Sequence, residues 1–194
     1  MTNEESGLRA RLVETGVELL AREGVEALDL CEIARRAGVP QGAPRRYVPT
    51  HRELLSAIAR HGFADLATRV QATLAGAPET DPRGRLATLG RVYLEYARTD
   101  PGMFELMFRH DLLESDAPGL RETSLPLFGV LVDLVGRTRP AGADPAVAAA
   151  AFWANLHGIA QLWHWGSLQP AAGRSDVEPL LQAVLDAHLG TADR

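Results

Sequence analysis

The chain has 194 residues, of which 46% are hydrophobic and 23% charged, and its formal net charge is −5. This composition indicates a soluble globular protein that is long enough for one or two domains with a core. Because Cys31 is its only cysteine, an intrachain disulfide is excluded and a reducing cytoplasm is expected, and the N-terminus lacks an apolar run of the signal-peptide type.

Helical periodicity begins close to the N-terminus. A helix with one apolar face is predicted from about Glu5 to Glu23, followed by a capping glycine. A second, short helix begins at Asp29, because Asp29 and Glu32 have the spacing of a capping box. Gly38 ends this helix where a left-handed cap is needed.

A third short segment covers residues 41–48, and Thr50 with Glu53 then opens a longer helix by the same capping pattern. Two short helices joined by a tight glycine turn form a helix-turn-helix, whose second helix lies in the major groove of DNA. The first helix would brace this motif, which gives a three-helix head.

Arginines gather in and after the predicted turn. Between residues 35 and 60 six arginines stand against one acid, so this segment carries a net +5 and the rest of the chain −10. A compact positive patch on an acidic protein indicates a local site for a polyanion, although a solvated helix face would give the same charges. The arginines are Arg35, Arg36, Arg45, Arg46, Arg52 and Arg60.

These segments carry a resemblance to a known family. From Met1 to about Leu55 the chain resembles the N-terminal domain of TetR-family transcriptional regulators, through ELLAREG at 18–24, IARRAGV at 33–39 and YVPTHRELL at 47–55. The resemblance implies contacts with bases or phosphates, and a phosphate contact near His51. With three residues of the basic patch, the predicted DNA-binding set is Arg35, Arg36, Gln41, Gly42, Ala43, Arg45, Arg46, Tyr47, His51 and Arg52.

The recognition segment departs from the family at three positions. Pro40 stands where the family usually has serine or threonine, Pro44 replaces an aliphatic or aromatic residue, and Arg45 replaces a frequent tyrosine. A proline is tolerated in the first turn of a helix, so a short, late-starting or distorted recognition helix stays open. The role of Arg45 and Arg46 stays open as well: they would either hydrogen-bond guanine bases or bind phosphate groups.

The remaining chain is helical in pattern. A long helix of residues 51–74 would act as a lever that joins the head to the rest. Further helical segments are predicted over residues 82–99, 102–113, 120–137, 145–173 and 177–189.

Two methionines and two phenylalanines crowd residues 103–108, and two tyrosines line the preceding helix. Such side chains serve a core equally well, but they also suit a pliable apolar pocket for a small molecule. The predicted ligand-binding residues are Phe63, Leu66, Leu89, Tyr93, Tyr96, Met103, Phe104, Met107, Phe108, Leu127, Leu131, Trp153 and His157.

Residues 145–173 contain no aspartate, glutamate, lysine or arginine. Their histidines, asparagine and glutamines argue against a membrane span, so one long helix buried on most sides is predicted. With the amphipathic helix after it, two copies would build a four-helix dimer seam. The predicted interface residues are Trp163, Leu180, Leu181, Val184 and Leu185.

A second resemblance lies in this half. FWANLHGIA at 152–160 is similar to the tryptophan–histidine–glycine signature of one TetR C-terminal subclass, and YLEYA at 93–97 with DPGMF at 100–104 resembles the same subclass. The resemblance implies an all-helical domain that senses a ligand and dimerises. Whether His157 is a structural residue or contacts the ligand stays open.

The fold class expected is therefore all-α with about nine helices, a helix-turn-helix DNA-binding domain in residues 1–55 and a ligand-sensing and dimerisation domain in residues 56–194. We expect a ligand-responsive repressor that binds a palindromic double-stranded DNA operator as a homodimer and is released by a small apolar or aromatic effector, without enzymatic activity, cofactor, metal or membrane contact. One alternative is an architectural DNA binder without ligand. The other is an all-helical metal-dependent phosphohydrolase, which would use His51, His61, His110, Asp111 and Asp133.

Overall fold

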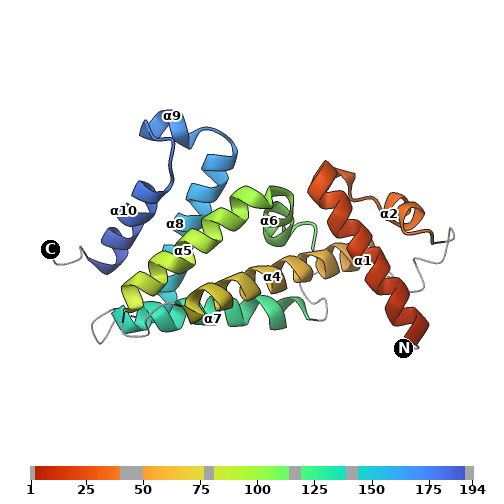
Figure 1. The fold of residues 1–194 in the computed structure, drawn as a ribbon, viewed down its shortest axis with the longest axis horizontal. Coiled ribbons are helices and arrows are strands. Elements are labelled where there is room, and N and C mark those ends of the chain that lie inside the picture. The colour runs from red at the N-terminus through yellow and green to blue at the C-terminus, as the bar shows by residue number, and fades with distance from the viewer. Residues whose placement is uncertain (1–2, 40–49, 77–80, 114–118, 139–143, 191–194) are drawn as a thin grey trace. The chain divides into compact units, whose positions relative to one another are not determined.

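The computed structural model describes residues 3–39, 50–76, 81–113, 119–138 and 144–190, and all regular structure in these ranges is helical (Figure 1). The predicted all-α class is confirmed. The helices are α1 Asn3–Glu23, α2 Leu30–Arg36, α4 His51–Ala75, α5 Pro82–Thr99, α6 Pro101–Phe108, α7 Leu120–Thr138, α8 Pro145–His164, α9 Leu168–Ala172 and α10 Glu178–Leu189, with a 3₁₀ turn at Val25–Ala27.

By its internal contacts the chain divides into two compact units. Unit 1 comprises residues 1–65 and 100–124, and unit 2 comprises residues 66–99 and 125–194. The division falls within α4 and within α7, and it assigns α6 to the unit of the N-terminal helices. The functional boundary expected near residue 55 lies in the same helix α4, ten residues upstream of this packing boundary, and stays a prediction.

Unit 1 is built around α1. This helix packs against α2, the 3₁₀ turn and α6, and its leucines Leu12, Leu19 and Leu20 are almost fully buried. The α1–α6 contact is close because Gly102 has no side chain: a Cβ atom there would lie 3.0 Å from the carbonyl oxygen of Leu20. The first helix therefore braces the short helices, as predicted.

Unit 2 is built from α5, α8 and α10, which pack against one another. Phe152 and Leu156 of α8 and Leu185 of α10 are at most 1% exposed. Gly90 of α5 allows α10 to come close, since a Cβ atom at that position would lie 2.6 Å from Leu181 Cδ1. Two ion pairs, Arg83–Asp186 at 2.5 Å and Arg91–Glu178 at 2.6 Å, also join α5 to α10.

The single long helix predicted over residues 145–173 is wrong. Helix α8 ends at His164, Gly166 adopts a positive φ of 71°, and the short helix α9 follows. The Ser167 N–H donates to the Leu162 carbonyl at 3.1 Å and the Gly166 N–H to the Trp163 carbonyl at 3.0 Å, which is the hydrogen-bond pattern of a Schellman cap.

Within the single chain, α8 is buried on one face only, and the burial of its other face that was expected from a dimer stays a prediction. Its buried residues Ala149, Phe152, Leu156 and Ala160 form one face, spaced as successive turns. Val147, Leu162 and Trp165 are 66%, 40% and 68% exposed. In the part of the chain described, no helix is long and apolar enough to cross a membrane.

Candidate functional site

Two helix starts in unit 1 have side-chain caps at the predicted positions. The Asp29 carboxylate accepts from the backbone N–H groups of Cys31 at 2.8 Å and Glu32 at 3.1 Å. Before α4, Thr50 and Glu53 cap each other: the Glu53 N–H donates to Thr50 Oγ1 at 3.0 Å, and the Thr50 N–H donates to the Glu53 carboxylate at 3.3 Å. The second pair is a complete capping box, whereas the Glu32 carboxylate binds arginines.

The glycine turn after α2 also has the predicted form. Gly38 has a φ of +66°, and its N–H donates to the Arg35 carbonyl at 3.3 Å. The Val39 N–H reaches back to the Ala34 carbonyl at 2.9 Å, and the Val39 side chain is 6% exposed. These two bonds are those of a Schellman motif, which turns the chain sharply after a short helix.

Arg35 and Arg36, predicted to contact DNA, share the carboxylate of Glu32. Arg35 binds it through two hydrogen bonds of 2.8 and 2.6 Å, and Arg36 through one of 2.6 Å. Hydrogen bonds from both arginines lower the pKa of Glu32 to about 2. Arg36 also pairs with Glu23 of α1 at 2.7 Å, so it ties α1 to α2, while the Arg35 side chain is 70% exposed.

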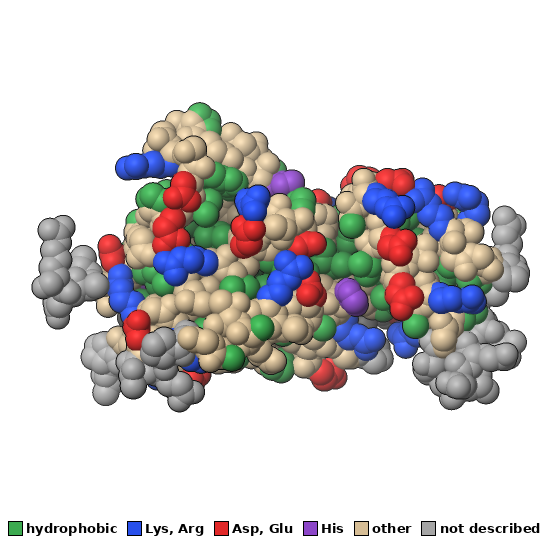
Figure 2. Space-filling view, viewed as in Figure 1, with side chains coloured by type: hydrophobic (Ala, Val, Ile, Leu, Met, Phe, Trp, Pro, Cys, Tyr) green, Lys and Arg blue, Asp and Glu red, His purple; other side chains and the backbone are tan. Residues whose placement is uncertain are grey.

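Acidic and basic side chains lie interspersed over α1 and α2 on the face shown in Figure 2. Exposed ion pairs of this kind contribute little to stability, and a phosphate group competes with the carboxylate for the same guanidinium. Arg35 is therefore better placed than Arg36 for exchange onto a phosphate, and the contacts of both with DNA stay predictions.

His51 and Arg52, at the start of α4, both bind backbone carbonyls of unit 1. The His51 Nε2–H donates to the Leu28 carbonyl at 2.5 Å, and Arg52 donates to the carbonyl of Asp111. Both side chains are largely exposed. The other residues of the predicted DNA-binding set lie outside the described residues, and they are Gln41, Gly42, Ala43, Arg45, Arg46 and Tyr47, together with Pro40 and Pro44.

The predicted ligand-binding residues fall into both units. In unit 1, Phe63 and Phe108 meet edge to face with ring centroids 5.7 Å apart, and Phe104 and Phe108 with centroids 5.0 Å apart. Met103 and Met107 pack against Gly62, where a Cβ atom would lie within 3 Å of both sulfur atoms. All but Phe108 are at most 8% exposed, so in this structure they form core.

In unit 2 three of the predicted residues form a hydrogen-bonded chain. The Trp153 Nε1–H donates to the Tyr93 hydroxyl at 3.0 Å, and the hydroxyl lies 2.9 Å from His157 Nδ1. The histidine tautomer decides which of the two donates, because a hydroxyl oxygen can accept from Trp153 and from a second N–H. Burial lowers the pKa of His157 and raises that of Tyr93, so both groups stay uncharged at neutral pH.

Five further residues of the predicted ligand-binding set also belong to unit 2. Leu66, Leu89, Tyr96 and Leu131 are buried and Leu127 is half-buried. The Arg69 guanidinium lies 4.7 Å from the centroid of the Tyr96 ring. The ligand-binding role of the whole set stays a prediction.

The predicted interface residues divide by burial. Leu181 and Leu185 are at most 1% exposed within this one chain, where they pack in the core of unit 2. Trp163, Leu180 and Val184 are half-buried. Only the latter three therefore present side-chain surface that a second chain would cover.

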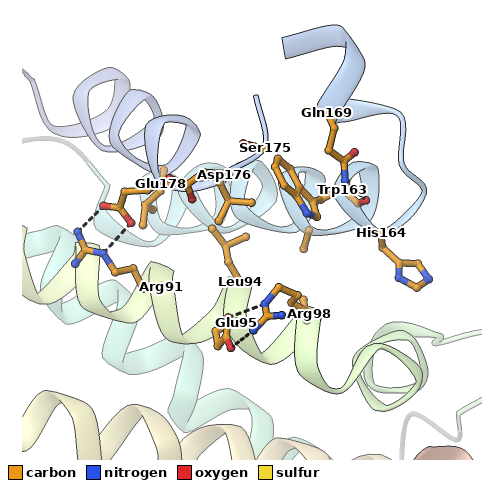
Figure 3. Close-up of a pocket in the computed structure, with 14 residues that line it drawn as sticks. Arg91, Leu94, Glu95, Arg98, Trp163, His164, Gln169, Ser175, Asp176 and Glu178 are labelled. Atoms are coloured by element: carbon orange, nitrogen blue, oxygen red, sulfur yellow. Dashed lines mark hydrogen bonds and ion pairs between the residues drawn. The ribbon is translucent and has the colours of Figure 1, made fainter. Parts of the chain in front are cut away.

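A groove in unit 2 shares no residue with the predicted ligand set (Figure 3). Its volume is about 700 Å³, and its walls are α5, the end of α8, α9 and the segment that leads into α10. Arg91 pairs with Glu178 at one end, and Glu95 with Arg98 along the α5 wall, each through two hydrogen bonds of 2.9 and 2.6 Å. The pair of Arg91 and Glu178 was missed because these residues stand 87 positions apart in sequence, and Glu95 and Arg98 because their spacing on α5 is that of an exposed face.

The residues of the phosphohydrolase alternative are not gathered as metal ligands. Across the described ranges, no group of three or more histidine, cysteine, aspartate or glutamate side chains is close enough to hold a metal ion. The Asp111 carboxylate accepts two hydrogen bonds from Arg109 at 2.8 and 2.9 Å, which lower its pKa.

Known structures have the same fold. A protein of unknown function from Rhodococcus sp. RHA1 matches with a TM-score of 0.77 and 26% identity, over 94% of this chain and 93% of that one. RolR in complex with resorcinol matches with a TM-score of 0.70 and 20% identity, over 97% and 89%.

Sequence comparison points the same way. The nucleoid occlusion factor SlmA of Haemophilus influenzae (strain PittGG) is 26% identical over 99 residues, which are 51% of this chain and 44% of the relative, so the chain spans less than half the length of this curated relative. The family model described as "Tetracyclin repressor-like, C-terminal domain" matches residues 86–188, more than half of the chain. The chain therefore belongs to the tetracyclin repressor-like family.

Proposed function

We propose that the protein is a homodimeric, DNA-binding transcriptional regulator that represses its target genes until a small apolar or aromatic effector binds. The observation that carries the proposal is the capped helix–turn after Asp29, within a chain of the tetracyclin repressor-like family. The motif has both caps of a helix-turn-helix first helix, and a local basic patch surrounds it.

The DNA contacts are assigned to the predicted set, with Arg45 and Arg46 as the main determinants. A two-fold dimer presents two recognition segments to successive major grooves, about 34–36 Å apart, which requires a palindromic operator. Arg35 adds a phosphate contact when it leaves Glu32. Arg36 and His51 hold α2 and α4 in place through Glu23 and the Leu28 carbonyl.

Dimerisation is supported by a stripe of apolar residues along α8 and its C-cap, which are exposed except for the half-buried Gly158. The stripe follows successive turns opposite the buried face, with small residues at its centre that permit close helix approach. Half-buried Leu180 and Val184 of α10 extend the surface available to a second copy. The stripe consists of Val147, Ala151, Ala154, Gly158, Leu162 and Trp165.

The effector site is assigned to the interior of unit 2 around Tyr93, Trp153 and His157. These are also the residues that carry the likeness to the tryptophan–histidine–glycine subclass, to which we assign the C-terminal domain. An aromatic effector with a hydroxyl group would exchange hydrogen bonds with this chain of donors and acceptors. The structure of RolR with resorcinol, a relative in fold, shows that such a fold binds a small phenol.

Repression and release follow from linkage. If the effector binds better to the conformation that has low affinity for the operator, its differential affinity weakens DNA binding, typically by ~1–3 kcal/mol for each linked equilibrium. Helix α4 belongs to both units, so a change in unit 2 has a continuous covalent path to unit 1.

The test is a titration of the purified protein with its upstream intergenic DNA at two salt concentrations, with a random duplex as reference. We expect salt-dependent binding of a dimer that is selective for the upstream DNA. Arg45→Ala and Arg46→Ala should each reduce the salt slope by about one, and Arg137→Ala, an exposed arginine of α7, should leave it unchanged. Equal affinity for the random duplex would reject the regulator, and release by resorcinol would identify the effector class.

A further inference from the structure

The groove of Figure 3 is separate from the interior that we assign to the effector, and its walls have a distinct chemistry. The volume of about 700 Å³ lies within the range of small-molecule sites, roughly 300–1,000 Å³. The floor is apolar, because Leu94, Ala160 and Leu181 that line it are at most 7% exposed. A ligand would therefore bury hydrocarbon against it.

One wall is aromatic. Trp163, in the last turn of α8, lines the groove and is half-buried (Figure 3). A tryptophan ring attracts a cation that lies over its face, more strongly than tyrosine or phenylalanine does. The indole thus favours an aromatic ring or an organic cation as occupant.

The charged side chains that line the groove favour a cationic ligand over an anionic one. Two arginines stand against three acids in the lining, so its arginines and carboxylates together carry a net charge of −1. Each arginine already binds a carboxylate through two hydrogen bonds: Arg91 to Glu178 and Arg98 to Glu95. An anionic ligand would have to displace those carboxylates.

Asp176 is the remaining acid. Its carboxylate accepts from the Glu178 N–H at 3.0 Å, and no arginine or histidine of the described chain lies within ion-pair distance of it. The negative charge of the groove therefore resides there, close to the segment that leads into α10.

Gln169 is the residue that α9 contributes to the groove wall. It lines the groove from α9, and its Nε2–H donates to the Trp163 carbonyl at 3.0 Å. Its Oε1 is buried without a donor in the described part of the chain. Because this oxygen has almost no accessible surface, it is closed to a ligand in the groove, and Gln169 contributes to the wall and not to the binding of charge.

We propose that this groove is a second ligand site, which binds a small aromatic cation: the ring lies on Trp163, and the ammonium lies at the Asp176 carboxylate. The groove and the effector site assigned to the interior have no residue in common. The groove lining differs in chemistry from the interior around Tyr93, so the two sites would bind different ligands.

The test uses the three tryptophan side chains of the full-length protein, whose indole N–H signals are few enough to assign in an ¹⁵N-labelled sample. Phenethylamine is the probe, and phenylacetate is the ring-matched anion. We expect phenethylamine in the millimolar range to shift the Trp163 signal and leave the Trp153 signal, which is fixed on Tyr93, in place. Phenylacetate should shift neither.

Two variants identify the contacts. Asp176→Asn should weaken phenethylamine binding a few-fold, and Trp163→Leu about two- to thirty-fold, the range expected for loss of a cation–π contact. Asp133→Asn, which removes an exposed carboxylate of α7 outside the groove, should leave the affinity unchanged. For Trp163→Leu, the binding is read from the Trp165 signal or by calorimetry.

Three outcomes would overturn the proposal. A shift of the Trp153 signal alone would place the probe in the interior. Equal binding of phenylacetate would remove the charge argument. Absence of any shift in the folded protein would mean that the groove does not bind aromatic cations. None of these results bears on operator binding, so the failure of this site and the failure of the regulator can be told apart.

Discussion

At the scale of single residues, the hydroxyl of Tyr93 joins two helices of unit 2, because it accepts from Trp153 and is hydrogen-bonded to His157. Such chains of hydrogen bonds in a protein interior are mutually dependent, since removal of one member leaves its neighbours unsatisfied. The same three side chains are then both a structural network and a ready set of donors and acceptors for an effector. Substitutions at Tyr93, Trp153 and His157 should therefore change the stability of unit 2, and they should also change effector affinity if the proposed site is right.

Tyr93→Phe should lower the free energy of unfolding by ~0.5–1.5 kcal/mol, because the indole N–H of the half-buried Trp153 loses its hydrogen bond to the Tyr93 hydroxyl. Trp153→Phe should cost less through hydrogen bonding, since a tyrosine hydroxyl can stay bound to His157. Urea denaturation of both single variants and the double variant should reveal a coupling of ~0.5–3 kcal/mol. Additive effects would mean that the hydrogen bond between them does not contribute.

His157 should make stability depend on pH. Burial lowers the pKa of His157 in the folded protein, while in the unfolded chain it should titrate near ~6.5. Below that pH the unfolded chain binds more protons than the folded one, so the free energy of unfolding should fall as the pH drops from about 7.5 toward 5.5.

The matched comparison is His157→Gln, which keeps a polar side chain but cannot titrate. Measured by urea denaturation at several pH values, the fall in stability should be shallower in this variant than in the parent. The other five histidines are present in both proteins, so the difference isolates His157. A steeper fall in the variant would show that the folded protein favours the protonated imidazole.

At the scale of elements, the turn after α2 depends on one glycine. A φ of +66° at Gly38 is costly for any residue with a Cβ atom, roughly 1–2 kcal/mol. Gly38→Ala should therefore destabilise unit 1 by about that amount and lower the affinity for DNA. Gly7→Ala, the same change at an exposed position inside α1, should stabilise by ~0.5–1 kcal/mol, as measured by thermal unfolding.

The element scale also shows what the sequence could predict. Caps and glycine stops define helix ends locally, so Pro82–Thr99 and the turn at Gly38 were predicted correctly. The end of α8 was missed although Gly166 carries the same kind of signal, because the absence of charge through residue 173 was given more weight. The groove could not be predicted, since its ion pair between Arg91 and Glu178 joins residues 87 positions apart.

At the scale of the whole molecule, the stripe on α8 is the surface that we propose for dimerisation. Ala154 lies at its centre and is exposed in the single chain, so a glutamate there leaves the fold of one subunit intact. Within a dimer the same carboxylate would be desolvated without a partner, which costs about 3 kcal/mol or more. Ala154→Glu should therefore weaken dimerisation by roughly 100-fold or more.

Sedimentation analysis should find Ala154→Glu monomeric at concentrations where the parent is dimeric, while Ala72→Glu on the exposed side of α4 stays dimeric. A monomer contacts one half-site only, and each half-site contributes its phosphate contacts to the salt slope. The variant should thus bind the operator with about half the salt slope of the parent. A monomeric variant with the full slope and affinity would mean that one subunit supplies all the contacts, and that the palindrome is not required.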